Sequence, residues 1–263
     1  MSLSSCKESA PPDKTVLAEF TPMYRSPMIL NGKVKSFKWR TYWAKEKDGK
    51  IIKGDIITRL ERDSLSFASD FNLELNEDGL TTKWEWITYN GEINYNEPEI
   101  VDGKIIGGTN FINGTFRNYY KREYDDSGRV LKGHVYRYGV DTLIRTVDFI
   151  YLENGSLDEV INNNYKGEIT GKSKFMWKDQ DHVSEHQRLN GNGELVSSMK
   201  PEYDESGNFI SVTYDYPNVR LTKYDSKDQE FDDMGNMISA VCYKNDTLFC
   251  IQDFLIEYYS ENY

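Results

Sequence analysis

The sharpest catalytic string in the sequence is His182-Val183-Ser184-Glu185-His186, which has the H-x-x-E-H pattern of some zinc sites. That pattern works on a helix, where two residues four apart share one face and can bind the same zinc ion. Turn residues near positions 180 and 193 place this string in the phase of a strand instead. On a strand the two imidazoles lie about 13 Å apart, too far to bind one ion directly. We therefore expect strand residues here and no metal site.

Paired acids are the next candidates, because closely spaced carboxylates can bind calcium. Three pairs occur, Asp125-Asp126, Asp204-Glu205 and Asp232-Asp233, but none has the dense D-x-D-x-D spacing of a calcium loop. Turn formation explains each pair without a metal. No serine lies in a G-x-S-x-G elbow, and no glycine-rich phosphate loop is present. The sequence therefore predicts that the protein is not an enzyme, and that it has no catalytic, cofactor-binding or metal-binding residue.

Cys242 and Cys250 stand at equal distances from Asp246, inside the turn-like stretch Asn245-Asp246-Thr247. In a hairpin of that register the two cysteines lie directly opposite each other. Their β-carbons are then about 4.5–5.5 Å apart, slightly wider than a disulfide prefers. Two interpretations stay open: a disulfide formed in an oxidising compartment, and a pair of buried thiols.

The tryptophans carry the clearest binding signal in the chain, and most of them fall in predicted strands. Their positions are Trp39, Trp43, Trp84, Trp86 and Trp177. In one interpretation they form the packed face of a sheet, which we expect for most of them. In the other, some form an exposed ligand platform, because tryptophan faces stack on sugar rings and on apolar side chains. A glycan or a protein segment is the partner that such a platform implies.

The composition narrows the classes of partner. The chain has 263 residues and a formal net charge of -11, with no cluster of Lys and Arg. Nucleic acid is therefore excluded as a partner, because phosphate binding requires a basic surface. No apolar run approaches the ~20 residues of a membrane-spanning helix. The 19 tyrosines and 14% aromatic content favour sheets, whose pleated surfaces accommodate aromatic side chains.

A repeated turn organises the elements that must position these residues. Tyr203-Asp204-Glu205-Ser206-Gly207-Asn208-Phe209 recurs in variant form at residues 124–130 and 231–237. Glycine-containing turns follow one another at steps of about 13 residues, which fits a strand plus a short turn. Successive strands are then antiparallel, and alternate turns lie along opposite edges of the sheet.

The fold class predicted is all-β: a long antiparallel β-meander of repeated hairpins, with about 15 strands, as a curled or rolled sheet. An open single-layer sheet and a β-sandwich are the alternatives. The C-terminal stretch 254–259 is predicted as a strand rather than a short helix. Charged residues on both faces of most predicted strands argue against a barrel inserted in the outer membrane.

The stretch 203–209 and its two variants resemble the YD repeat of RHS-type proteins, and Gly-Lys-Ile-Ile at 49–52 and 103–106 resembles MORN-like and YwqK-type repeats. Both families build antiparallel β-structure from hairpins, so the resemblance implies fold more than function. The MORN-like resemblance also implies an immunity or antitoxin-like protein that binds a partner.

At the N-terminus, Leu3-Ser4-Ser5-Cys6 resembles the lipobox of bacterial lipoproteins, and the chain is similar to envelope lipoproteins of Bacteroidetes. This resemblance implies lipidation of Cys6, a tether over residues 1–14 and a single repeat β-domain over 15–263. We expect a non-enzymatic cell-envelope lipoprotein with a binding or scaffolding role, held to the outer membrane by its lipid alone and either periplasmic or surface-exposed. The alternatives are a carbohydrate- or lipid-binding module and the immunity-like protein. No cofactor is expected.

Overall fold

The computed structural model describes residues 14–17, 28–57, 71–87, 93–217 and 221–260. None of these residues lies in a helix, so none forms a helix that could cross a membrane. The strands are β1 (Lys14–Leu17), β2 (Met28–Asn31), β3 (Val34–Lys47), β4 (Lys50–Ile56), β5 (Phe71–Leu75), β6 (Thr81–Ile87), β7 (Ile93–Val101), β8 (Lys104–Ile112), β9 (Thr115–Tyr124), β10 (Val130–Arg137), β11 (Leu143–Tyr151), β12 (Leu157–Asn164), β13 (Ile169–Trp177), β14 (Val183–Asn190), β15 (Leu195–Tyr203), β16 (Phe209–Asp215), β17 (Thr222–Phe231), β18 (Met237–Lys244) and β19 (Thr247–Tyr258).

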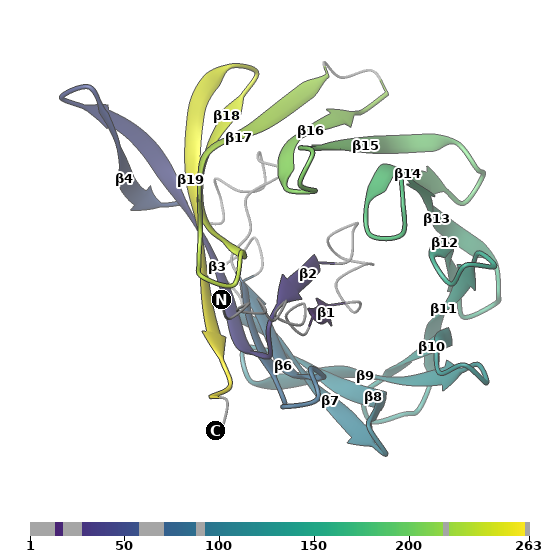
Figure 1. Ribbon diagram of the computed structural model, residues 1–263. Coiled ribbons are helices and arrows are strands. Elements are labelled where there is room, and N and C mark those ends of the chain that lie inside the picture. Colours follow the sequence, from purple (N-terminus) through teal and green to yellow (C-terminus); the bar gives the residue numbers. More distant parts are fainter. Residues whose placement is uncertain (1–13, 18–27, 58–70, 88–92, 218–220, 261–263) are drawn as a thin grey trace, which may run out of the picture.

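The strands from β3 to β19 form a closed antiparallel barrel, seen along its axis in Figure 1. Around the ring each strand pairs with the next, except that β3 is followed by β5, because β4 pairs with β3 outside the ring. Strand β19 returns to β3 in a register that runs from Cys250 opposite Trp43 to Tyr258 opposite Val34. This seam closes a ring of sixteen strands in the described part of the chain. The prediction of an all-β antiparallel meander is confirmed, and the rolled sheet is in fact fully closed. The alternatives of an open sheet and a sandwich are wrong, because the seam pairs the two sheet edges.

The strand β3 is long enough to serve two partners on the same side. Its first half pairs with β5 through residues 36–39, and its second half pairs with β4 through residues 42–47. The hairpin of β3 and β4 therefore projects beyond the ring, at the upper left of Figure 1. The predicted C-terminal strand is also confirmed, since β19 runs through residue 258.

The recurrent acidic stretch forms the turns, as predicted. In the copy between β15 and β16, Asp204 Oδ1 accepts hydrogen bonds from the amides of Ser206 at 2.9 Å and Asn208 at 2.8 Å. The Gly207 amide closes the turn onto the Asp204 carbonyl, and Gly207 has a φ of 85°. This is the arrangement of a three-residue hairpin loop with glycine in the left-handed region. Asp125 and Asp232 make the same pairs of bonds in their own turns.

Side chains at the ends of several strands bond back to the preceding strand. In each case the donor reaches a backbone carbonyl near the start of that strand, about 20 residues earlier. The four bonds are Tyr124 to Ile105, Tyr151 to Val130, Trp177 to Leu157, and Gln229 to Phe209, at 2.5–3.0 Å. These four bonds, which we call rim latches, join neighbouring strands where the backbone ladder ends. One of them explains why the repeat copy at residues 124–130 begins with an aromatic residue, since Tyr124 is its donor.

The two faces of the barrel differ in chemistry. Side chains alternate along a strand, so Val147 and Phe149 face the interior while Asp148 between them points outward. The outward face carries cross-strand ion pairs at 3.1–3.5 Å: Lys132–Asp148, Lys174–Glu159 and Lys200–Glu185. A further pair, Lys223–Asp225 at 2.9 Å, lies within β17. A lipid-facing surface would be apolar, because a charge on it is costly at the bilayer midplane. This outward face is therefore suited to water.

The N-terminal hairpin of β1 and β2 lies within the outline of the ring in Figure 1. Leu30 of β2 packs in an apolar cluster with Phe37, Leu73 and Phe254 of the barrel wall. Beside it, the side-chain amide of Asn236 accepts from the Asn31 amide at 2.7 Å and donates to the Asn31 carbonyl at 2.8 Å. The third copy of the acidic turn thus fixes the end of β2 to the barrel.

Candidate functional site

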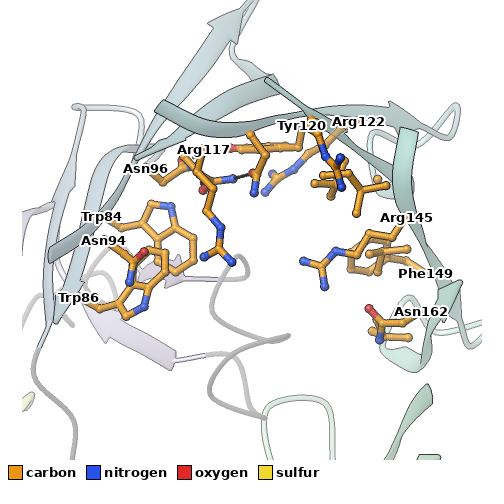
Figure 2. A pocket seen from close by; sticks show the side chains of 18 of the residues that line it. Trp84, Trp86, Asn94, Asn96, Arg117, Tyr120, Arg122, Arg145, Phe149 and Asn162 are labelled. Atoms are coloured by element: carbon orange, nitrogen blue, oxygen red, sulfur yellow. Dashed lines mark hydrogen bonds between the residues drawn. The ribbon is translucent and has the colours of Figure 1, made fainter. Parts of the chain in front are cut away.

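The barrel contains a cavity of about 820 Å³, lined by the inward side chains of β6 to β13. Figure 2 shows this cavity from close by. The described residues that line it are Thr81, Trp84, Trp86, Asn94, Asn96, Asn110, Arg117, Asn118, Tyr120, Arg122, Gly133, Val135, Arg137, Ile144, Arg145, Val147, Phe149, Val160, Asn162 and Ser173.

One wall of the cavity is a pair of tryptophans on β6. Trp84 and Trp86 stand two residues apart, so both point inward, and their rings stack with centroids 4.6 Å apart. Both rings are half-buried, and both pack against the apolar cluster that contains Phe37 and Leu73. That support fixes the rings in place while one side of each contributes to the cavity (Figure 2).

An asparagine ladder continues the wall across β7, β8 and β9. The register places Asn96, Asn110 and Asn118 directly opposite one another on successive strands. The Asn96 amide donates to Asn110 at 2.8 Å, and the Asn110 amide donates to Asn118 at 2.6 Å. The Tyr120 hydroxyl donates to the Asn96 carbonyl oxygen at 3.3 Å. These bonds orient the amides, which leaves a row of aligned polar groups beside the tryptophans.

Four arginines surround the remaining space: Arg117 and Arg122 from β9, Arg137 from β10 and Arg145 from β11. A bulge aims the first of them. In the pairing of β8 with β9, Asn118 lies opposite Asn110 and Phe116 lies opposite Phe111, so Arg117 has no counterpart. Such an extra residue locally breaks the alternation, and both Arg117 and Asn118 consequently line the cavity.

A second bulge acts in the same way on β11. Val135 lies opposite Arg145 and Tyr136 lies opposite Leu143, so Ile144 is the extra residue. Ile144 and Arg145 both line the cavity as a result. Figure 2 shows the Arg117 and Arg145 side chains entering the same space from different strands, with the two tryptophans beside Arg117 and across the space from Arg145.

The floor of the cavity is apolar. Val147, Phe149 and Val160 line it and belong to a cluster that also contains the buried Phe175 and Val183. The site thus combines flat aromatic faces, oriented amides, guanidinium groups and a small apolar surface. This arrangement can bind a polar molecule with apolar ring faces, and it contains no assembled nucleophile and base among the described lining residues.

The structure separates the five tryptophans of the predicted platform. Only Trp84 and Trp86 reach the cavity. Trp39 packs on Phe254 in the apolar cluster with centroids 5.2 Å apart, and Trp43 packs edge-on against Phe249. The Trp177 indole donates to the Leu157 carbonyl as one of the rim latches. A role in ligand binding therefore stays a prediction for Trp84 and Trp86.

Four of the five residues of the H-x-x-E-H string lie on the strand β14, and none lies in a helix, as expected. His186 is buried in β14, and its ring stacks on Phe175 with centroids 4.6 Å apart. His182 lies before the strand, where Nδ1 contacts the Asp179 carboxylate at 2.7 Å and Nε2 lies 3.2 Å from the Gly207 carbonyl oxygen. The two histidines therefore serve different packing contacts. Among the described residues, no group of three or more His, Cys, Asp or Glu could hold a metal ion.

Cys242 and Cys250 lie directly opposite each other on β18 and β19, as their spacing predicted. Both are buried free thiols beside Ile57, and the hydrogen bond between them together with burial raises the pKa of Cys242. The disulfide stays a prediction. Cys6 and the rest of the predicted tether up to residue 13 lie outside the described residues.

Sequence reasoning missed the arginines and the asparagine ladder. The alternating residues 118, 120 and 122 on one strand, all able to form hydrogen bonds, could have indicated a polar interior face. Arg117 could not have been found in this way, because strict alternation from Asn118 places it on the outward face.

A closed antiparallel ring around a cavity of about 820 Å³ defines the class of this protein as a β-barrel with an internal cavity. The sequence matches no family model, and it matches no curated protein. Among solved structures, it is similar to a porin-like protein from Bacteroides uniformis, at 10% identity and a TM-score of 0.55, over 85% of this chain and 96% of that chain. At this identity the similarity concerns the fold alone.

Two weaker matches are also found. A porin-like protein from Bacteroides vulgatus is 13% identical over 84% of this chain and 97% of that chain, with a TM-score of 0.31. The structure described as TcdB2-TccC3-TEV is also 13% identical, with a TM-score of 0.36, over 93% of this chain and 16% of that chain. We draw no argument from scores of this size.

Proposed function

We propose that this protein is a non-enzymatic binding protein that holds a carbohydrate in the barrel cavity. The observation that carries the proposal is the stacked pair Trp84 and Trp86 beside the asparagine ladder. Tryptophan faces stack on the apolar faces of sugar rings, and asparagine amides bond to hydroxyl groups in pairs. The cavity of about 820 Å³ lies within the range of roughly 300–1,000 Å³ typical of small-molecule sites, so a short oligosaccharide fits.

The test is a glycan array followed by titration calorimetry on any glycan that binds. Trp84→Ala should weaken binding at least 10-fold, because one stacking face is lost. Tyr138→Ala is the matched control, since Tyr138 is an aromatic residue that is 60% exposed and does not line the cavity. Unchanged affinity in Trp84→Ala, with the fold intact by circular dichroism, would contradict the proposed site.

A lipid is the second candidate ligand, because Val147, Phe149 and Val160 give the cavity an apolar floor. An acyl chain would lie on this floor and leave the tryptophan and asparagine wall unused. Val160→Asn, with its fold checked by circular dichroism, should therefore weaken fatty-acid binding much more than glycan binding. A protein that binds palmitate and no member of the glycan array would favour the lipid over the carbohydrate.

We also propose that the protein acts at the cell envelope and is attached to the membrane only through a lipid on Cys6. The ion pairs on the outward face support attachment rather than insertion. Mass spectrometry of the membrane fraction after expression of the full precursor tests this proposal. A protein without acyl chains, recovered only in the soluble fraction, would refute it.

A further inference from the structure

We propose that the ligand of the barrel cavity is anionic: an oligosaccharide that carries carboxylate or sulfate groups. This inference rests on the proposed function and adds the charge of the ligand to it. It depends on a different set of residues, the four arginines, and can therefore fail while carbohydrate binding stands.

The sign of charge in the cavity is opposite to that of the protein. The chain has 43 acidic residues against 32 Lys and Arg. Yet the described residues that line the cavity include four arginines and no Asp or Glu. Positive charge gathered within a concave, partly enclosed site raises the local concentration of anions. A neutral ligand would not require this segregation of charge.

Three of the four arginines of the cavity are available to a ligand. Within the described part of the chain, Arg117, Arg137 and Arg145 make no ion pair with an acidic side chain, and all three are exposed. The outward lysines behave differently, since Lys132, Lys174 and Lys200 each pair with a carboxylate across the sheet. Unpaired like charges that share one space repel each other, and a bound anion relieves that repulsion.

The type of cation also points to carboxylate or sulfate. Every basic residue among the described lining residues is an arginine, and none is a lysine. A guanidinium group is planar and presents parallel N–H donors that match two oxygens of one oxyanion. The bulge at Arg117 and the position of Arg145 bring two such groups into the space facing Trp84 and Trp86 (Figure 2). A sugar ring stacked on the tryptophans would present its acidic substituent to Arg117 and Arg145.

The experiment compares matched glycans that differ only in charge. The probes are tetragalacturonate with its fully methyl-esterified form, sialyllactose with lactose, and a sulfated oligosaccharide with its desulfated form, each titrated calorimetrically into the full chain. We expect binding of at least one acidic member and at least 10-fold weaker binding of its neutral partner. Affinity for the acidic member should also fall as salt is raised from about 50 to 500 mM.

Two double variants identify the arginines as the cause. Arg117→Gln/Arg145→Gln should weaken the acidic glycan about 10- to 100-fold and leave its neutral partner unchanged. Lys132→Gln/Lys174→Gln removes the same net charge from the outward face and should leave both affinities unchanged. Circular dichroism checks the fold of each variant.

Each outcome decides between the two proposals. Equal binding of acidic and neutral partners, or loss of both in the arginine variant, would overturn the anionic ligand and leave the carbohydrate site in place. Binding of no glycan in any pair would overturn both proposals. Weaker binding of the acidic glycan in the lysine variant, with unchanged binding in the arginine variant, would show that only long-range charge matters. That result would also overturn the inference.

Discussion

At the scale of single residues, each copy of the repeat stabilises its turn through one side chain, the aspartate that follows the aromatic residue. The Asp204 carboxylate satisfies two backbone amides that the turn leaves without strand partners. Asparagine does the same work at positions 76, 164 and 190, where Oδ1 accepts the equivalent pair of amide bonds. The acidity of the repeat is therefore a consequence of turn chemistry, since either residue type can fill the position.

Asp204→Asn should consequently preserve the turn at neutral pH, whereas Asp204→Ala should destabilise the protein. Alanine keeps the size of the β-carbon but leaves the amides of Ser206 and Asn208 without their acceptor. Thermal unfolding measured for both variants checks this: the melting temperature should drop clearly for alanine and only slightly for asparagine. Equal losses in the two variants would mean that the carboxylate charge, and not the acceptor, is what stabilises the turn.

The same carboxylates should make the fold sensitive to acid. The Asn208 side-chain and backbone bonds lower the pKa of Asp204 from 3.8, and the bond from the Arg129 amide lowers that of Asp125 strongly. A pKa that is depressed in the folded state stabilises the protein above the unfolded value, and this contribution is lost as pH falls through the folded value. Urea unfolding midpoints should therefore be constant from pH 7 to pH 5 and fall below pH 4. The fall should be smaller in Asp204→Asn, and an identical acid profile in that variant would contradict the assignment.

At the scale of elements, the rim latches connect hairpins that the turns alone would leave independent. Tyr151 is half-buried at the end of β11, and its hydroxyl donates to the Val130 carbonyl at 3.0 Å. Arg129 lies over the same ring, with its guanidinium carbon 4.9 Å from the centroid, so the ring joins two successive turns of one rim.

Tyr151→Phe should lower the free energy of unfolding by about 1 kcal/mol, the typical net contribution of one hydrogen bond. The ring and its packing are kept, so the change isolates the hydroxyl. Tyr165→Phe is the control, because Tyr165 is 62% exposed and no hydrogen bond of its hydroxyl is seen in the described structure. Chemical denaturation of both variants measures the difference. Equal stabilities would show that the hydrogen bond of Tyr151 does not stabilise the fold.

The sequence predicts elements of this kind only in part. The period of the turns predicts the strands, their antiparallel order and the alternation of turns between two rims, because each hairpin is specified by its own local residues. The bulges at Arg117 and Ile144 escape this reasoning, since they depend on the register of a neighbouring strand. Of the candidate site, Trp84 and Trp86 were therefore predicted from the sequence, whereas the asparagine ladder and the four arginines were not.

At the scale of the whole molecule, the seam between β3 and β19 decides between a rolled sheet and a barrel. Its interior contacts are aromatic: Phe254 is 5% exposed and packs on Phe37 and Trp39 with centroids 5.9 and 5.2 Å apart. The hydrophobic alternation of either strand would be the same in an open sheet, because one face is buried in both cases. Closure could not be predicted from the sequence for this reason.

Phe254→Ala should destabilise the barrel by about 3–5 kcal/mol, the usual cost of removing a buried phenylalanine. Leu255→Ala is a matched control from the next position on the same strand, where the side chain is 55% exposed and the cost should stay below about 0.5 kcal/mol. Urea unfolding gives both values. Similar small losses in the two variants would show that the seam does not depend on its aromatic contacts.

The seam also sets the order of events during folding. Almost every other strand pairing joins neighbours in the chain, and hairpins of that kind form within microseconds. In the described part of the chain, the seam brings together residues as distant as Ser36 and Glu257, which are 221 positions apart. Closure is therefore the slow, late step. Until it occurs, β3 and β19 expose unpaired edges to other chains, so protein concentration during refolding should determine the yield of closed monomer.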